Sequence, residues 1–286
     1  MALTINTNIS ALVAQKNLNN ATTSLNQAIE RMTTGYKINH AGDNAAGYSI
    51  ARRWETQLGS LDVAADNAAT GADMLSTLED NYSLISTHLQ RVRDLTEQAA
   101  NGTYGADSLA AIKSEITARL DEVTRISSNC EFNGKDLMSG AGTAINIQVG
   151  IDSSANSRIT LEASMTAAAD SVTLFKAKDN SLTSIDAIAT KASTGDPSTM
   201  LGTIDNVMKT ISERVTKLGA AQNRIDSAIE SIAVQSENVT SSLSTLRDAD
   251  IASESSKYIQ SQILQQAAAT LLSTANQSPS IALNLI

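Results

Sequence analysis

The sequence is poor in aromatic residues, proline and cysteine, and each shortage excludes a class of fold. Only 3% of residues are aromatic, although apolar residues still make up 42%. Such a chain buries aliphatic stripes between helices rather than a thick aromatic core. Neither of the two prolines precedes residue 197, which leaves room for very long helices. The single cysteine, Cys130, excludes an internal disulfide framework.

Basic clusters, long apolar runs and a secretory signal are also missing. The net charge is -9 and no basic run stands out, so nucleic acid is not an expected partner. No apolar run approaches the roughly 20 residues of a membrane span. The first eight residues have neither the charged nor the apolar region of a cleaved signal. By these rules alone we expect a cytoplasmic protein without membrane contact.

Heptad-patterned aliphatic residues occupy the N-terminal segment. We expect a first helix from Ile5 to Thr34, with Gly35 as its stop signal. Its apolar residues form a seam with alternating spacings of three and four, at Leu18, Ala21, Leu25, Ala28 and Met32, preceded on a shifted phase by Ile5, Ile9, Leu12 and Val13. A connector rich in glycine and asparagine follows, in which Asp43 is the expected N-cap of the next helix.

Two further helices and a change of period follow. We expect a long helix from Asp43 to Ala100 and a third from Ala106 to Ser128. Asn133-Gly134 predicts a tight turn. Strict alternation from Ile145 to Ile151, resumed at Ile159 and Leu161, predicts a β-hairpin. Residues 163–198 are rich in Ala, Ser, Thr and Asp and are expected to be surface loops.

The C-terminal half returns to heptads. A seam from Ile204 to Leu246 keeps the four-three rhythm, with Gln222 and Ser236 as its polar members. This face needs cover, and the 43–100 helix is the partner available in the chain. A last helix is expected from Ala249 to Ala275, ended by Pro279. Its apolar face and the apolar tail would be buried by assembly, and they include Leu264, Leu271, Leu272, Leu283 and Leu285.

The expected fold is mainly α: a long antiparallel coiled-coil or helical-bundle rod from the N- and C-terminal segments, with a small β-hairpin region in the middle. Residues 1–42 with 248–286 would form a terminal helical domain, and 43–140 with 199–247 the rod. Residues 141–198 would form a short hairpin and loop segment without large outer domains. The terminal helices carry few charges, so we expect them to be buried only in a polymer and disordered in the monomer.

Several motifs in this order resemble bacterial flagellin. They are the segments 5–8, 29–35, 43–47, 89–95, 132–134, 219–224 and 262–267. The resemblance implies a homopolymeric tube whose lumen is lined by the terminal helices. It also implies unfolded export through the flagellar type III channel, which overrides the cytoplasmic expectation and places the protein in the extracellular filament. The implied partners are an export chaperone at 250–286, a filament cap protein and the hook–filament junction proteins.

The resemblance further implies recognition by a host Toll-like receptor. The positions that match are Gln90, Arg91, Leu95, Glu115 and Arg119. Taken alone, Arg91 and Glu115 read equally well as solvated helix charges. Leu283 and Leu285 match the leucines used in cytosolic sensing of flagellins, whereas Ile286 departs from that pattern.

Three other functional classes compare with a filament subunit. An enzyme is disfavoured because the two histidines, His40 and His88, form no His-Glu-x-x-His motif, and no phosphate loop or nucleophile elbow occurs. We therefore expect no catalytic residue, metal or cofactor. A hook–filament junction protein shares the terminal helices, and a secreted coiled-coil adhesin shares the heptads, so both remain alternatives to a filament subunit.

Overall fold

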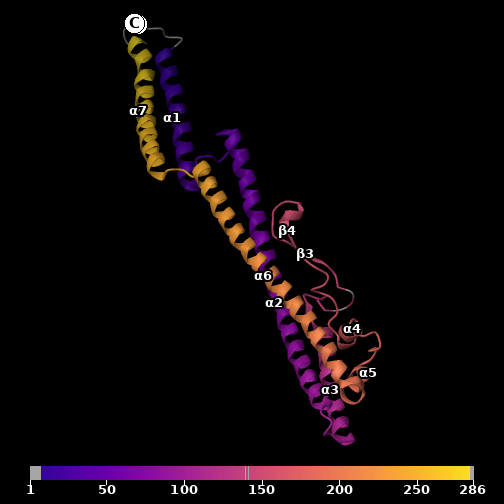
Figure 1. Ribbon diagram of the computed structural model, residues 1–286. Helices are drawn as coiled ribbons and strands as arrows, with labels where there is room; N and C mark the ends of the chain where they lie inside the picture. Colours follow the sequence, from indigo (N-terminus) through magenta and orange to yellow (C-terminus); the bar gives the residue numbers. More distant parts are fainter. Residues whose placement is uncertain (1–7, 139, 141, 284–286) are drawn as a thin grey trace. The chain divides into compact units, whose positions relative to one another are not determined.

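A computed structural model describes residues 8–138, 140 and 142–283 of the chain. Long helices from both ends of the chain and a small β region between them confirm the mainly α class (Figure 1). The α-helices are α1 (Ile9–Thr34), α2 (Ala45–Ala100), α3 (Ala106–Asn129), α4 (Ser171–Lys176), α5 (Ile185–Thr190), α6 (Pro197–Arg247) and α7 (Ile251–Leu283). The strands are β1 (Glu131–Phe132), β2 (Lys135–Asp136), β3 (Ile145–Gln148) and β4 (Arg158–Leu161).

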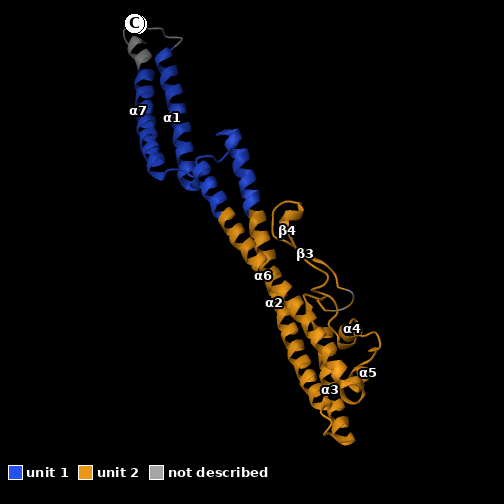
Figure 2. Cartoon of the chain, viewed as in Figure 1, with its two compact units in different colours: residues 1–58, 237–286 blue, residues 59–236 orange. Residues whose placement is uncertain are grey.

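The chain divides into two compact units, which Figure 2 colours separately. Unit 1 comprises residues 1–58 and 237–286, and unit 2 comprises residues 59–236. Both α2 and α6 contribute residues to each unit. These limits differ from the three segments expected from the sequence, and that division stays a prediction about the assembled polymer.

Unit 2 has a continuous aliphatic core. It is built from α2, α3 and α6, and its fully buried members include Leu78, Ile85 and Leu89, Ile116 and Leu120, and Ile204, Leu218 and Ile225. The heptad seam of α6 is therefore covered where it lies in this unit, as expected, with each buried aliphatic side chain contributing about 1.5–3 kcal/mol. The polar seam residue Gln222 donates to a carboxylate oxygen of Glu79 on α2 at 2.8 Å.

The predicted turn and the predicted hairpin are both present. Asn133 and Gly134 have φ values of 51° and 73°, as a primed turn requires, and they join β1 to β2. β3 pairs antiparallel with β4, with Ile147 opposite Ile159. Ile147 lies against α2 at Gly71, where an added Cβ would come within 2.8 Å of its Cδ1. Gly71 therefore leaves the space into which the hairpin docks.

The expectation of surface loops at 163–198 is wrong for part of that segment. Asp170 caps α4 by accepting from the Thr173 amide, and Ser184 caps α5 by accepting from the Ala187 amide. The short helices bury Phe175 and Ile188 completely. A helix of six residues is too short to display a repeat, so the pattern of periodicity did not reveal either one.

Two expected helix ends also differ. Asp43 does not cap α2, because its carboxylate accepts from the backbone amides of Asn39 and His40. These contacts, that of His40 foremost, lower the pKa of Asp43. Asn44 caps α2 instead, through a 2.9 Å hydrogen bond from the Gly47 amide. At the other end of the chain, α7 continues through Pro279 to Leu283 rather than ending before the proline.

Candidate assembly surface

Helices α1 and α7 lie side by side in unit 1 (Figure 1). α1 begins at the N-cap Asn8 and ends at Gly35, whose φ of 75° is the left-handed conformation of a helix C-cap. The residues that the pair buries are small or polar and follow a heptad spacing. On α1 they are Ala14, Ala21 and Ala28, and on α7 they are Glu254, Ser261 and Ala268. Small side chains at the contact allow two helices to approach closely.

The large aliphatic residues of the same two helices remain outside this seam. Ile9 and Leu12 on α1 are 70% and 62% exposed, and Leu264 and Leu271 on α7 are 52% and 62% exposed. Leu18, Leu25, Met32 and Leu272 are half-buried. Ile5, Leu285 and the side chain of Leu283, which the sequence also assigned to polymerisation, lie outside the described residues. Several large apolar residues left exposed on one pair of helices indicate an interaction site.

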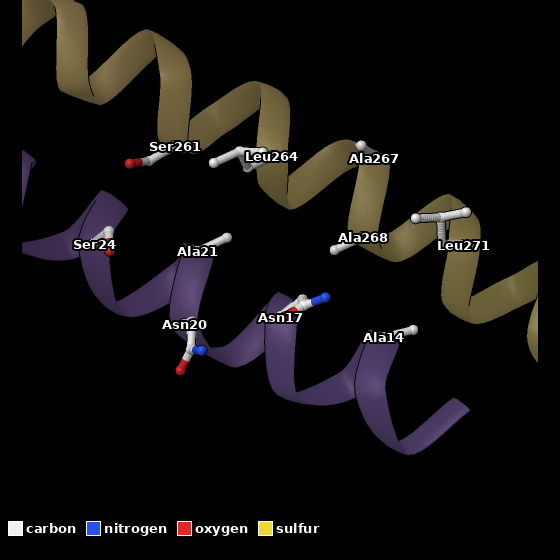
Figure 3. A pocket seen from close by; sticks show the side chains of 10 residues that line it. All are labelled: Ala14, Asn17, Asn20, Ala21, Ser24, Ser261, Leu264, Ala267, Ala268 and Leu271. Atoms are coloured by element: carbon white, nitrogen blue, oxygen red, sulfur yellow. The ribbon is translucent and has the colours of Figure 1, made fainter. Parts of the chain in front are cut away.

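A groove of about 330 Å³ runs between the two helices (Figure 3). Ala21, Ala268 and Leu264 face it, whereas Asn20 points away from the neighbouring helix. The rest of its lining comes from Ala14, Asn17, Ser24, Ser261, Ala267 and Leu271. The groove is thus a shallow apolar recess between exposed leucines, a shape that accepts the side chains of another helix.

Three polar contacts tie α1 to α7 along the seam. At one end, Arg31 lies 3.6 Å from the buried carboxylate of Glu254. In the middle, Gln265 donates to the hydroxyl of Thr22 at 3.0 Å. At the other end, the side-chain amide of Asn8 donates to the carbonyl oxygen of Ala275 at 2.7 Å. Because the seam residues repeat every seven positions, the seam alone would fit more than one register. The three polar contacts distinguish the observed register from the others.

The two connectors that lead out of the pair are joined to each other. Tyr36 and Asp248 form an antiparallel bridge, and the Lys37 amide donates to the Arg247 carbonyl at 2.7 Å. The guanidinium of Arg247 lies 4.0 Å from the centroid of the Tyr36 ring and forms an ion pair with Glu55. We call this arrangement the connector clasp. It fixes the segments between α1 and α2 and between α6 and α7 to one another.

Four of the five expected receptor positions lie at the surface of unit 2, and three of them are joined by ion pairs. Arg91 is 2.9 Å from Glu115, and Arg119 is 3.7 Å from the same carboxylate oxygen. Gln90 donates to Asp94 at 2.9 Å. Leu95 is different: it is 2% exposed and belongs to the core of the unit. Its side chain is therefore not part of the surface formed by the other four.

Other kinds of site find no support in the part of the chain that the structure describes. Within those residues no group of three or more His, Cys, Asp or Glu side chains is placed to hold a metal ion. No helix over the same residues combines the length and the hydropathy of a membrane span.

Comparison with known proteins decides the family. Residues 5–143 match the family model of the bacterial flagellin N-terminal helical region, and residues 201–286 match that of the C-terminal helical region. The chain belongs to the bacterial flagellin family. It is 34% identical to a flagellin of Bacillus subtilis and 31% identical to flagellin FlaB1 of Treponema pallidum, with 99% of each chain covered in both cases.

A solved structure shares the fold at lower identity. It is a putative flagellar hook-associated protein from Vibrio parahaemolyticus, with a TM-score of 0.60 at 15% identity, covering 72% of this chain and 100% of that one. The fold therefore does not separate a filament subunit from a hook-associated protein, whereas the sequence matches do. As a flagellin, the chain is a structural subunit that polymerises with its own copies into the extracellular flagellar filament used for motility.

The residues that build the α1–α7 seam were only partly found from the sequence. The large aliphatic residues were assigned to polymerisation, but the alanine seam beneath them was not separated from these. Its signal was present, since Ala14, Ala21 and Ala28 repeat every seven residues. The contact between Asn8 and Ala275 joins opposite ends of the chain and could not be read from spacing.

Proposed function

We propose that this flagellin assembles through the α1–α7 pair, with the exposed aliphatic residues of one copy covered by the same two helices of neighbouring copies. The observation that carries this proposal is the sorting of side chains. The pair buries small or polar residues along its seam and leaves isoleucines and leucines in water. A helix pair that was complete by itself would bury its largest apolar residues first.

The free energy available from this surface is substantial. Ile9, Leu12, Leu264 and Leu271 are each more than half exposed. Covering these four side chains on assembly would contribute on the order of 5 kcal/mol per copy, before the half-buried leucines are counted. In a filament each copy meets several others, so this contribution offsets the entropic cost of association and of ordering the terminal helices.

The proposed arrangement in the filament follows from this. Residues 1–42 and 248–286 would line the lumen, residues 43–140 and 199–247 would form the surrounding rod layer, and residues 141–198 would lie outside without a large outer domain. The terminal helices would fold on assembly and be disordered in the free subunit. The aliphatic residues that they expose when unpartnered support this order of events.

Export and assembly factors are part of the same proposal. The subunit would leave the cell unfolded through the flagellar type III channel. A chaperone would cover residues 250–286 beforehand, where Ile259, Ile263 and Leu264 are each more than half exposed. The filament cap and the hook–filament junction proteins would be its neighbours at the two ends of the filament. No catalytic role is proposed.

Host recognition by a Toll-like receptor is proposed for the surface around Arg91 and Glu115. Two arginines that share one carboxylate present a fixed pattern of charge, and Gln90 lies beside them in sequence. Leu95 would act only by supporting this surface from the core, because its side chain is buried.

A hook–filament junction protein is the alternative expected from the sequence, and a hook-associated protein shares the fold. The two candidates differ in what the purified chain forms. A filament subunit extends flagellar seeds into long tubes, whereas a junction protein adds a limited number of copies and stops. Negative-stain microscopy of seeded protein distinguishes these outcomes.

A matched pair of variants tests the surface itself. Ile263→Gln removes an aliphatic residue that is 60% exposed on α7, and Ile151→Gln removes one that is 44% exposed in unit 2. Neither change opens a core, so both soluble chains should keep their helical circular dichroism. We expect Ile263→Gln to raise the critical concentration for seeded growth by at least about tenfold, and Ile151→Gln to leave it unchanged. Equal growth of both variants would contradict the proposal.

A further inference from the structure

We propose that Asn8 and Pro279 act together to fix the register of α1 against α7, with the proline freeing one carbonyl of α7 that the asparagine then recognises. This inference rests on the proposal that the α1–α7 pair is the assembling surface. It concerns which residue positions the two helices, not whether they assemble.

The proline explains why the carbonyl of Ala275 is free. In an α-helix each carbonyl accepts from the amide four residues later, and a proline has no amide hydrogen to donate. The helix α7 continues through Pro279 to Leu283. The carbonyl that loses its partner is therefore that of Ala275, and it is the one that accepts the 2.7 Å hydrogen bond from Asn8.

Asn8 meets two requirements with one side chain. Its Oδ1 accepts from the amide of Ala11 at 3.1 Å and so caps α1, while its Nδ2 donates to Ala275. Only one orientation of the side-chain amide satisfies both contacts. Among the residues that cap helices well, aspartate has no donor, and serine and threonine have a single hydroxyl on a shorter side chain. Asparagine alone combines the cap with an amide donor.

The contact between Asn8 and Ala275 also helps to set the register of α1 along α7. The seam repeats alanine or serine every seven residues on both helices, at 14, 21 and 28 and at 261 and 268. A slip of one heptad would bring small residues opposite small residues again. In the interior of α7, every carbonyl except that of Ala275 accepts from the amide four residues later. If α1 shifted along α7 so that Asn8 faced one of these carbonyls, its side-chain amide would find no free acceptor. The freed carbonyl of Ala275 therefore distinguishes the observed register from a slip that would bring Asn8 opposite Ala268, inside the helix.

Removing the donor while keeping the cap tests the first half of the proposal. Asn8→Asp retains the capping oxygen, so α1 still begins correctly, but it places a carboxylate against the carbonyl of Ala275. We expect this variant to be incorporated about tenfold less efficiently than wild type into wild-type seeds. The readout is the ratio of the two proteins in the filament, measured by peptide mass spectrometry after mixing equal amounts.

Restoring the missing amide tests the second half. Pro279→Ala returns a helical donor to the Ala275 carbonyl, so the carbonyl no longer needs Asn8. In the Pro279→Ala background, Asn8→Asp should cost less than about threefold in incorporation. If Asn8 acted only as a helix cap, Asn8→Asp would cause no loss in either background, because aspartate keeps the capping oxygen.

A crosslink reports the register directly. Thr22→Cys with Gln265→Cys joins two positions whose side chains are in contact at 3.0 Å, and Thr22→Cys with Tyr258→Cys joins positions that would meet only after a shift of one heptad. In wild-type background the first pair should form the disulfide in filaments and the second should not. With Asn8→Asp the preference should weaken, and with Pro279→Ala added it should remain weak, because the contact between Asn8 and the Ala275 carbonyl is absent in both variants.

Three results would contradict the proposed role of Asn8 and Pro279. The same loss from Asn8→Asp in both backgrounds, no loss in either, or complete exclusion of Pro279→Ala from wild-type seeds would each overturn the proposal. Failure of the proposed assembly function would be a different result, because the wild-type chain itself would then not extend seeds.

Discussion

At the scale of single residues, Gly71 shows how one position in a long helix can decide where the β region docks. A Cβ at this position would lie 2.8 Å from Cδ1 and 3.0 Å from Cγ2 of the buried Ile147. We expect Gly71→Leu to force the β3–β4 hairpin away from α2 and to lower the free energy of unfolding by about 1–3 kcal/mol. Urea unfolding of the full chain, followed by circular dichroism, measures this change.

The matched control is Gly59, which lies in the same helix with nothing within 4 Å of its Cβ position. Leucine is the better helix former by close to 1 kcal/mol, so Gly59→Leu should stabilise the chain slightly. If both variants shift the urea midpoint in the same direction, the docking role of Gly71 is wrong.

A second residue, Cys130, should make the free energy of unfolding depend on pH. Its side chain is 2% exposed, and burial raises the pKa of its thiol from 9.0 to about 11. The folded chain therefore keeps its proton where the unfolded chain loses it. The stability linked to this group is complete below pH 9 and is lost as the pH rises toward 11, by up to about 1.4 kcal/mol per pH unit. In Cys130→Ala, stability should fall less steeply over this range, and urea unfolding at pH 8 and pH 10 compares the two slopes. Parallel slopes would show that the thiol is not responsible.

Residue-level roles were predicted unevenly from the sequence. Gly35 as a helix stop and Asn133-Gly134 as a turn were correct, because both depend on local backbone conformation. Asp43 as a helix cap was wrong by one position, since two adjacent residues, Asp43 and Asn44, can both cap and only the three-dimensional turn decides between them. Leu95 was grouped with surface positions, although its place on α2 puts it in the core.

At the scale of elements, the connector clasp is the feature whose removal is most informative. Arg247 is stacked over Tyr36 and paired with Glu55, and its side chain is only 13% exposed. Arg247→Met keeps much of the aliphatic stem but removes both contacts, which should weaken the clasp by about 1–2 kcal/mol. In filaments, trypsin should then cleave after Lys37 about tenfold faster, because cleavage follows the population of the opened connector. The N-terminal peptide released is measured by mass spectrometry.

Arg247→Lys is the control for this element. It keeps the positive charge near Glu55 but lacks the planar group that stacks on Tyr36, so its cleavage rate should lie between those of the wild type and Arg247→Met. If Arg247→Met is cleaved no faster than wild type, the side chain does not hold the connectors together.

The elements themselves follow a simple rule of predictability. Helices long enough to show several heptads were found with their bounds nearly correct, because the repeat averages out local exceptions. The helices α4 and α5 were missed because each has six residues. The end of α7 was misplaced because a proline usually stops a helix, and the compensating hydrogen bond from Asn8 comes from the other end of the chain.

At the scale of the whole molecule, the two ends of the chain and its middle differ in how they bury their large aliphatic residues. The core of unit 2 is formed by residues 59–236 with one another, and its largest side chains are fully buried. The α1–α7 pair keeps its large aliphatic residues exposed. Stability of the subunit should therefore depend on the middle of the chain, and assembly should depend on its ends.

Removing one end separates these two properties. Deletion of residues 1–40 takes away α1, and deletion of residues 248–286 takes away α7, while both leave residues 59–236 intact. We expect each shortened protein to unfold cooperatively with the helical circular dichroism of its remaining helices, and neither to extend wild-type seeds in negative-stain images. Loss of helical signal throughout would contradict an independent middle. Growth of long tubes by either shortened protein would contradict the role of the ends, because a single terminal helix offers no partner for its alanine seam.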